Sequence, residues 1–354
     1  MRENWKYVSF EDCLQKVPKQ QAVKSKDYLE NGLFPIVSQE SDLISGYTSD
    51  EHILYKHEKP VIIFGDHTKN IKYIDFNFVV GADGVHILSV KDDILPKFFY
   101  YELCSIKLRN LGYARHYKLL KEKEICYPDI AEQERIVALL DAEFAKIDAL
   151  KANAASQLQA AKDLFQSALK EMLTPKEGWE EKTLGEICDI LDSKRKPITK
   201  NKRVSGSIPY YGATGVLDYV KDYIFDEKLV LLGEDGAKWG AGENSSYIIC
   251  GKSWVNNHAH ALKPHRNIIL DEFLVYYLNY SDLSESITGV TVPKLNQEKM
   301  RAIVIPIPSL SEQERIAARL DAISEKVKAL QANYDQTITL CNDLKQSLLK
   351  SIFA

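Results

Sequence analysis

Apolar positions between Glu132 and Met172 predict one long helix. The segment has no glycine or proline and is dominated by Ala, Leu, Lys, Gln and Glu, which favour helix. Its apolar residues follow a four–three alternation that is broken only at Lys151, a pattern typical of a coiled-coil seam. The predicted seam residues are Leu140, Phe144, Ile147, Ala154, Leu158, Ala161, Phe165, Ala168 and Met172.

The stretch that begins at Ala131, "AEQERIVALLDAEFAKIDALKAN", returns at Ser311 as "SEQERIAARLDAISEKVKALQAN". Its predicted seam is Ile323, Val327, Leu330, Tyr334, Ile338, Cys341, Leu344 and Leu348. We expect Asp129 to cap the first helix, and Ser311 with Glu314 to form a capping box on the second. Each helix would span roughly 60 Å, longer than a domain core, so the two helices are expected to pair with each other. The alternative is that each stripe packs on its own domain.

The segments outside these helices predict two related heads of α+β class. Trp5 precedes "SFEDCL" as Trp179 precedes "TLGEIC", and "LFPIVS" matches "SIPYYG" in the same order. Short runs such as "PVIIF" and "LVLLG" predict strands, and "KFFYYELCSIKL" and "DEFLVYYLNYSDL" predict helices. The predicted domains are head 1 (1–128), a first helix (129–174), head 2 (175–308) and a second helix (309–354).

This order is an internal repeat with pseudo-twofold symmetry. The first helix leads into head 2, and only an antiparallel return would bring the second helix back to head 1. Such symmetry suits a target with two half-sites, and duplex DNA is the obvious candidate. The helices would then fix the gap between the half-sites.

Composition narrows the possible settings. The 354 residues are 45% hydrophobic, no apolar run approaches the roughly 18 residues that cross a bilayer, and the N-terminus has no signal core. The six cysteines form no CxxC pair, which argues against zinc ribbons and disulfides. We therefore expect a cytoplasmic protein without membrane contact. A net charge of -4 leaves only local basic patches as candidates for binding nucleic acid.

Three basic segments are candidates for DNA contact. The densest, "SKRKPITKNKR", suits an exposed loop that grips phosphates or reads base edges, although a solvated charge run or an address signal would look the same. The segment "GEDGAKWGAG" could form an anion nest around its lysine, or be only a tight loop. The third candidate is a sparser group of basic residues in head 1, which could grip phosphate or equally be a helix surface. The candidates are Lys194, Arg195, Lys196, Lys200, Lys202, Arg203 and Lys238 in head 2, and Lys107, Arg109, Arg115, His116 and Lys118, interleaved with Tyr113 and Tyr117, in head 1.

No catalytic constellation stands out. His258, His260 and His265 form a cluster that could ligate a metal, but no carboxylate or cysteine accompanies it in the motif, so we favour hydrogen-bonding or core roles. The D/N-P-P-Y/F signature of adenine methyltransferases is absent. We expect neither a metal nor a catalytic residue in this chain.

The whole chain resembles the specificity subunit of type I restriction-modification systems. The resemblance rests on "PDIAEQERIV" and "PSLSEQERIA", on Pro128, Glu132, Gln133 and Ile136 matched by Pro308, Glu312, Gln313 and Ile316, and on "VPKLNQEKMRAIVIPIP". It implies that the heads are target recognition domains, each reading half of a split DNA sequence, and that the helices form an antiparallel coiled coil. Lys294, in the "PKLN" sequence, is a further candidate for DNA contact, and Lys118-Leu119 can be aligned with Lys294-Leu295.

The resemblance also implies partners. The chain would bind double-stranded DNA and recruit two modification subunits that methylate adenine with S-adenosylmethionine. The full complex would add two restriction subunits that use ATP with Mg²⁺, and this chain itself would hold no cofactor. The acidic helix starts are candidate docking points, against the alternative that they only compensate the helix dipole: Glu132, Gln133, Glu134, Glu312, Gln313 and Glu314. A rival interpretation is a coiled-coil tether that joins two protein partners without reading DNA.

Overall fold

The computed structural model describes residues 4–82, 84–112, 114–289 and 291–353. The chain divides into two units, each described by itself. Unit 1 runs to Ala154 and adds the residues from Asp335 onward, and unit 2 is Ala155–Tyr334. The part of unit 1 before the first long helix is called head 1, and the part of unit 2 between the long helices is called head 2. Within the described ranges, no helix has the length and apolar character needed to cross a membrane.

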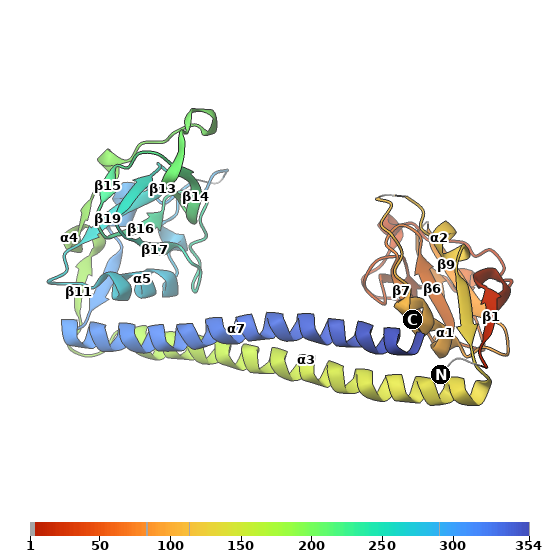
Figure 1. Cartoon of the computed structure of the whole chain (residues 1–354). Helices are drawn as coiled ribbons and strands as arrows, with labels where there is room; N and C mark the ends of the chain where they lie inside the picture. Colours follow the sequence, from red (N-terminus) through yellow and green to blue (C-terminus); the bar gives the residue numbers. More distant parts are fainter. Residues whose placement is uncertain (1–3, 83, 113, 290, 354) are drawn as a thin grey trace. The chain divides into compact units, whose positions relative to one another are not determined.

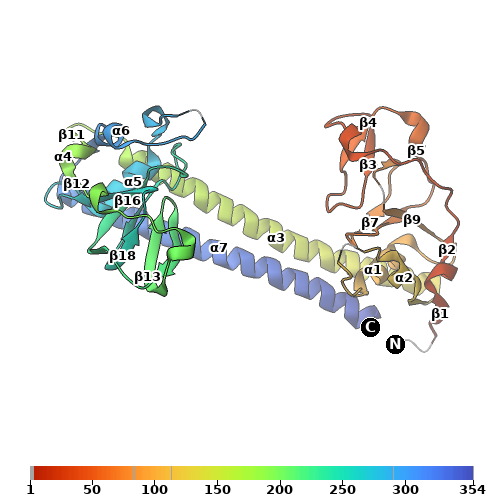
Figure 2. The same cartoon turned by 90° about the horizontal axis from the view of Figure 1, so that it is seen from above.

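The two long helices are α3 (Ile130–Leu173) and α7 (Leu310–Phe353), each of 44 residues (Figures 1 and 2). Asp129 caps α3, as expected, because its Oδ1 accepts a hydrogen bond from the backbone N–H of Glu132 at 3.0 Å. The capping box predicted at Ser311 is wrong. The helix already begins at Leu310, and Ser309 is the cap, with its Oγ 3.3 Å from the backbone nitrogen of Glu312.

The helices run antiparallel inside each unit. In unit 1, Lys151 Nζ lies 2.7 Å from Asn342 Oδ1, and Lys345 Nζ lies 2.6 Å from Asp148 Oδ1, so residue numbers rise on α3 as they fall on α7. In unit 2, the end of α3 shares a hydrophobic core with the start of α7, as Ala168 and Met172 do with Ile316 and Leu320. This pairing confirms the predicted antiparallel arrangement.

One predicted seam position is wrong. The Leu344 side chain is 48% exposed, and the neighbouring Lys345 turns toward α3 instead. Its ammonium group lies 5.0 Å from the ring centre of Phe144 and pairs with Asp148. A cation is stable here because its aliphatic stem packs against the seam while its charge meets an aromatic face and a carboxylate.

Head 1 contains two four-stranded sheets and a strand pair. The first sheet has the order β2 (Leu14–Gln15), β9 (Val85–Val90), β6 (Val61–Gly65) and β7 (Ile71–Ile74); the second has β4 (Gly46–Thr48), β3 (Phe34–Val37), β8 (Phe78–Val80) and β5 (Leu54–Tyr55). The strands β1 (Lys6–Ser9) and β10 (Glu124–Tyr127) pair, and the helices are α1 (Pro96–Ser105) and α2 (Tyr117–Lys121). The central strand β6 is buried along its whole length, as its "VIIFG" sequence requires.

Head 2 repeats the sheet topology strand by strand. The first sheet has the order β12 (Cys188–Ile190), β19 (Ala259–Pro264), β16 (Leu229–Gly233) and β17 (Ser246–Ile249); the second has β14 (Gly215–Val220), β13 (Ser205–Gly212), β18 (Lys252–Val255) and β15 (Phe225–Asp226). The pair is β11 (Glu180–Thr183) with β20 (Val304–Ile307), and the helices are α4 (Leu184–Ile187), α5 (Asp271–Tyr280) and α6 (Gln297–Arg301). Each head also carries a parallel pair, β3 with β8 and β13 with β18. The internal repeat predicted from the sequence is therefore confirmed.

Each head is closed by the end of a long helix. In unit 1 the last turn of α7 enters the core of head 1, where the Phe353 ring lies 5.3 Å from that of Phe98. Leu173, at the end of α3, is fully buried in the core of head 2. The second helix thus returns to head 1, as the connectivity predicted.

Candidate nucleic-acid interface

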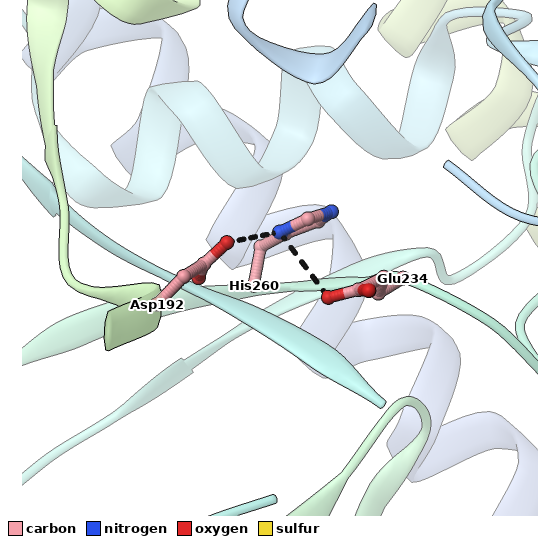
Figure 3. A group of neighbouring side chains, drawn as sticks. All are labelled: Asp192, Glu234 and His260. Atoms are coloured by element: carbon pink, nitrogen blue, oxygen red, sulfur yellow. Dashed lines mark hydrogen bonds and ion pairs between the residues drawn. The ribbon is translucent and has the colours of Figure 1, made fainter. Parts of the chain in front are cut away.

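The loops of head 2 that carry the basic residues converge at one sheet edge. Strands β12 and β16 both run antiparallel to β19, so both end at the edge where β19 begins. The loop 191–204 follows β12, and the loop 234–245 follows β16. Asp192 and Glu234 stand near the starts of these loops, and His260 lies between them on β19 (Figure 3).

These three side chains form the centre of a buried ion network. His260 Nδ1 lies 2.6 Å from Asp192 Oδ2 and 3.6 Å from Glu234 Oε2. Arg195 bridges the two carboxylates, with Nη1 2.6 Å from Glu234 Oε2 and Nη2 3.2 Å from Asp192 Oδ2. Lys294 Nζ lies 2.6 Å from Glu234 Oε1. Every carboxylate of the network therefore faces a cationic side chain.

The environment holds both carboxylates in their charged form. Burial raises the pKa of Asp192, but hydrogen bonding and charge from His260, with the charge of Arg195, outweigh burial and lower it. Burial likewise raises the pKa of Glu234, and the hydrogen bonds from Lys294 and Arg195 lower it below its usual value. The hydrogen bond to Glu234 in turn raises the pKa of Lys294.

Asp192, Glu234 and His260 are close enough to suggest a metal site, since their ligand atoms lie within 4.8 Å of one another. Arg195 and Lys294 already supply the positive charge that a metal would bring. The group is better described as an ion-pair network that joins loops.

The network changes the interpretation of Arg195. Its side chain is only 11% exposed, and its guanidinium is bound inside head 2, so this geometry favours a structural role over DNA contact. Arg203 is also engaged, because it lies 4.3 Å from the Tyr210 ring centre and 3.0 Å from Asp218 Oδ2. For Arg203 to contact DNA as predicted, its interaction with Tyr210 or with Asp218 would have to break.

The lysines of the same loop are placed differently. Lys194, Lys196, Lys200 and Lys202 are exposed, and no described carboxylate pairs with them. The loop backbone is nevertheless held, because Trp254 Nε1 donates to the carbonyl of Lys196 at 2.6 Å. A fixed loop that presents unneutralised lysines is suited to a phosphate backbone.

Lys238 lies in the neighbouring loop, on a tight turn. Gly236 and Gly242 adopt positive φ angles of 71° and 80°, and Trp239 Nε1 donates to the carbonyl of Gly233 at 2.9 Å. The Lys238 side chain is 80% exposed, with Glu243 3.8 Å away. The anion nest around Lys238 stays a prediction.

Head 1 has an equivalent basic loop that sequence reasoning missed. The loop from β2 to β3 carries Lys16, Lys19, Lys24 and Lys26, all exposed, and no described carboxylate pairs with them. These lysines are spread over eleven positions, so no dense run draws attention to them. The alignment of "SFEDCL" and "LFPIVS" with "TLGEIC" and "SIPYYG" contained the signal, because it places 19–29, with Lys19, Lys24 and Lys26, opposite "SKRKPITKNKR".

The acidic centre of head 1 is smaller. Asp66 follows β6 as Glu234 follows β16, and His86 pairs with Phe64 on β6 as His260 pairs with Leu232 on β16. Asp66 Oδ2 lies 3.3 Å from His86 Nε2 and 4.0 Å from Arg115 Nε. Burial raises the pKa of Asp66, but the hydrogen bonds from the Tyr117 backbone and from His86 lower it overall.

Two of the basic residues predicted in head 1, Arg115 and His116, lie beside this centre. The backbone N–H of His116 donates to Asp66 O, as that of Leu295 donates to Glu234 O, so Arg115 is the counterpart of Lys294. The suggested alignment of Lys118 with Lys294 is therefore wrong: Lys118 is an exposed residue of α2. Lys107 and Arg109 are exposed in the segment between α1 and α2, and Tyr113 lies outside the described residues.

Two of the predicted docking residues are internal. The Gln133 amide accepts from the backbone of Leu95 at 2.8 Å and donates to the carbonyls of Asp93 and Pro128. The Gln313 amide makes the equivalent bonds to Leu270, Ile268 and Pro308. Both side chains are 0% exposed, so their role is to fasten each long helix to its head, and a partner could not reach them. Among the predicted docking residues, only the glutamates remain accessible to a partner.

The glutamates at the helix starts face outward. Glu132 pairs with Arg135 at 2.7 Å and Glu312 with Arg315 at 3.3 Å. Glu134 and Glu314 are exposed. The two helix starts therefore carry equivalent groups: one glutamate paired with an arginine, and one exposed glutamate, Glu134 or Glu314.

The fold agrees with comparisons to known proteins. Residues 2–160 and 176–340 match the family model of the type I restriction modification DNA specificity domain. The chain belongs to this family.

Two relatives illustrate the similarity. A Haemophilus influenzae protein named as a putative type I restriction enzyme specificity subunit, S.HindORF215P, is 37% identical over 143 residues, which cover 40% of this chain and only 37% of that protein. The EcoR124I/EcoR124II specificity subunit of Escherichia coli is 27% identical over 360 residues, covering 91% of this chain and 87% of its own length.

Solved structures share the fold. A chain from a study of complex assembly and conformational transition of the type I R-M system superposes with a TM-score of 0.72, at 20% identity, over 99% of this chain and 98% of that one. The HsdS subunit from Thermoanaerobacter tengcongensis gives a TM-score of 0.54, also at 20% identity, over 100% and 97%. At these identities the likeness concerns the fold alone.

Proposed function

We propose that this chain is the DNA-specificity subunit of a type I restriction-modification complex. Each head reads one half of a split target, and the chain itself performs no chemistry. The proposal rests on a feature that both heads share. In each head, the loop between the two sheets presents exposed lysines that have no described acidic partner. Lysines neutralise phosphates, and neighbouring polar groups can read base edges in the major groove.

The proposed partners follow from this role. The chain brings double-stranded DNA to two modification subunits, which hold S-adenosylmethionine and receive the flipped adenine. Two restriction subunits, using ATP with Mg²⁺, complete the assembly where the host supplies them. Family membership favours this function over a tether that holds two proteins without reading DNA.

Docking of the modification subunits is assigned to the acidic helix starts. Reversing charge at Glu132 and Glu312 to lysine is expected to weaken assembly by about tenfold, since each start would repel the cationic surface it attracted. Co-purification with the modification subunit measures the effect. The matched control is Glu143→Lys, on α3 away from the helix start; unchanged assembly in the double variant would remove the docking role.

The long helices are proposed to set the gap between half-sites. Inserting one heptad into both α3 and α7 adds about 10 Å of helix, equivalent to roughly three base pairs. The gap in the methylated motif should lengthen accordingly. A gap that stays the same in a folded variant argues against this role.

The decisive experiment is to co-express the chain with the modification subunit encoded beside its gene and to map N6-methyladenine in host DNA. A split motif with a methylated adenine in each half, lost when the chain is omitted, is the expected result. A folded complex that gives no chain-dependent methylation would favour the tether.

A further inference from the structure

We infer that the ion network around Arg195 positions the lysine-bearing loop of head 2 and thereby determines how strictly head 2 reads its half-site. The inference rests on the proposed function. It concerns residues that touch no DNA themselves, because Arg195, Asp192 and His260 are enclosed in head 2.

Arg195 lies in the first half of the 191–204 loop, between two of its lysines. Its neighbours Lys194 and Lys196 are exposed, while its own guanidinium points inward to Glu234 Oε2 and to the carbonyl of Ala259, at 2.6 and 2.7 Å. The planar guanidinium meets three acceptors at once, counting Asp192, which a single ammonium group cannot match in the same geometry. Fixing Arg195 therefore fixes the backbone from which both lysines project.

The network also fastens a second segment. Leu295 donates its backbone N–H to the carbonyl of Glu234 and accepts at its own carbonyl from His260 Nε2, both at 2.8 Å. Gln297 Nε2 donates to Asp192 Oδ2 at 3.0 Å. The segment around Lys294 and the lysine-bearing loop thus meet on the same two carboxylates, so the position of one depends on the other.

Head 1 shows what the same edge looks like without this arginine. A cavity of about 330 Å³ opens between the β2–β3 loop and the start of β9, and its walls include Pro18, Val85 and His86. Val85 and His86 are the counterparts of Ala259 and His260 by strand register, and Pro18 aligns with Asp192 in the sequence. In head 2, Arg195 bonds to Asp192 and to the carbonyl of Ala259. In head 1 this space is a cavity, and among the described residues no ion pair joins the lysines of its loop to Asp66 or His86.

The experiment uses the full chain in complex with its modification subunit and the variant Arg195→Met, which keeps the length and removes the charge. Losing hydrogen bonds between charged groups should speed amide exchange in 191–204 by about tenfold or more, while 16–27 in head 1 stays unchanged. The methylated motif should become degenerate in one half only. The control Lys196→Met should weaken DNA binding at raised salt without altering exchange in the loop.

A second variant covers the case in which Arg195→Met does not fold. Gln297→Leu removes one hydrogen bond to Asp192 from an exposed residue, and a smaller change in the same direction is expected. An intact motif in a folded variant overturns the inference, whether or not loop exchange has changed. Absence of chain-dependent methylation with the wild-type chain would instead contradict the proposed function, so the two failures are distinguishable.

Discussion

Heads 1 and 2 share one topology but differ at the edge that carries the basic loops. Both place an acidic residue after the central strand and a histidine on the next strand, Asp66 with His86 and Glu234 with His260. Head 2 adds Arg195, whose guanidinium binds both Asp192 and Glu234, whereas head 1 has a cavity beside His86. The strand framework is therefore repeated, while the interactions that hold its loops are particular to each head.

A second position also has the same strand framework in both heads but different side-chain interactions. Lys72 on β7 and Tyr247 on β17 occupy equivalent registers, and each donates to a carbonyl at the end of a central strand of the second sheet: Lys72 Nζ to Ser38 at 2.9 Å and Tyr247 Oη to Gly212 at 2.5 Å. Burial lowers the pKa of Lys72 and raises that of Tyr247. The hydrogen bond to this carbonyl is present in both heads, but its donor is a lysine ammonium group in head 1 and a tyrosine hydroxyl in head 2. The two heads therefore differ in charge at this position.

The largest predicted effect tests the closure of the heads by the helix ends. Phe353→Ala should destabilise unit 1 by about 3–5 kcal/mol, because it removes an aromatic ring from the core beside Phe98. Leu173→Ala, at the equivalent end of α3, should destabilise unit 2 by about 2–5 kcal/mol instead. Hydrogen exchange resolved by unit measures each loss. Equal loosening of both units by either variant would contradict separate closure.

The buried glutamines come next. Gln133→Ala leaves the backbone N–H of Leu95 without its acceptor and should cost unit 1 about 1–3 kcal/mol; Gln313→Ala should cost unit 2 the same through Leu270. Denaturant titration followed by unit-resolved exchange is the measurement. The exposed neighbour Glu134→Ala is the matched control and should change stability by less than about 0.5 kcal/mol.

Glu234 should make unit 2 sensitive to acid. Its pKa in the folded state lies below its usual value of 4.5, so the stabilisation is present above that value and is lost as pH falls through the folded pKa. Glu234→Gln should therefore unfold at a lower temperature than the wild type at pH 7, and the difference should shrink below about pH 4.5. Calorimetry across this range, with the half-exposed Glu243→Gln as control, checks the sign. A difference that is constant with pH would exclude the ionised carboxylate as its source.

The smallest effects should come from single lysines of the basic loops. Replacing Lys19 in head 1 or Lys200 in head 2 by methionine should weaken DNA binding at moderate salt and lower the salt slope of log K by about one for each phosphate that is no longer neutralised. Fluorescence anisotropy of labelled target DNA with the assembled complex measures both values. Lys326→Met, on α7, serves as a control with the same loss of charge. An unchanged salt slope for every loop lysine would remove these loops from the interface.

The larger features of the fold could be predicted from the sequence. Helix-forming composition indicated the long helices, and the duplicated stretches revealed the repeat before any contact was known. The basic run "SKRKPITKNKR" was found in the same way, but the sequence did not show that Arg195 turns inward while its lysine neighbours remain exposed. A sequence pattern gives the residue types but not the directions of their side chains. An arginine in a basic run therefore has the same pattern whether its side chain points into the domain or into solvent.

Local propensity and periodicity were enough to predict the long helices and several strands and helices of the heads, because these depend on residue types at short spacing. The repeat followed from the duplicated stretches, and the antiparallel pairing followed from helix length and chain connectivity. The interaction partners emerged only from the folded chain, where Gln133 bonds to Leu95 and Arg195 bonds to Glu234. These interactions join residues far apart in the chain, and their free energy depends on burial and on the geometry of several groups at once. These interactions can form only after the folded strands have brought the loops to the same edge of the sheet.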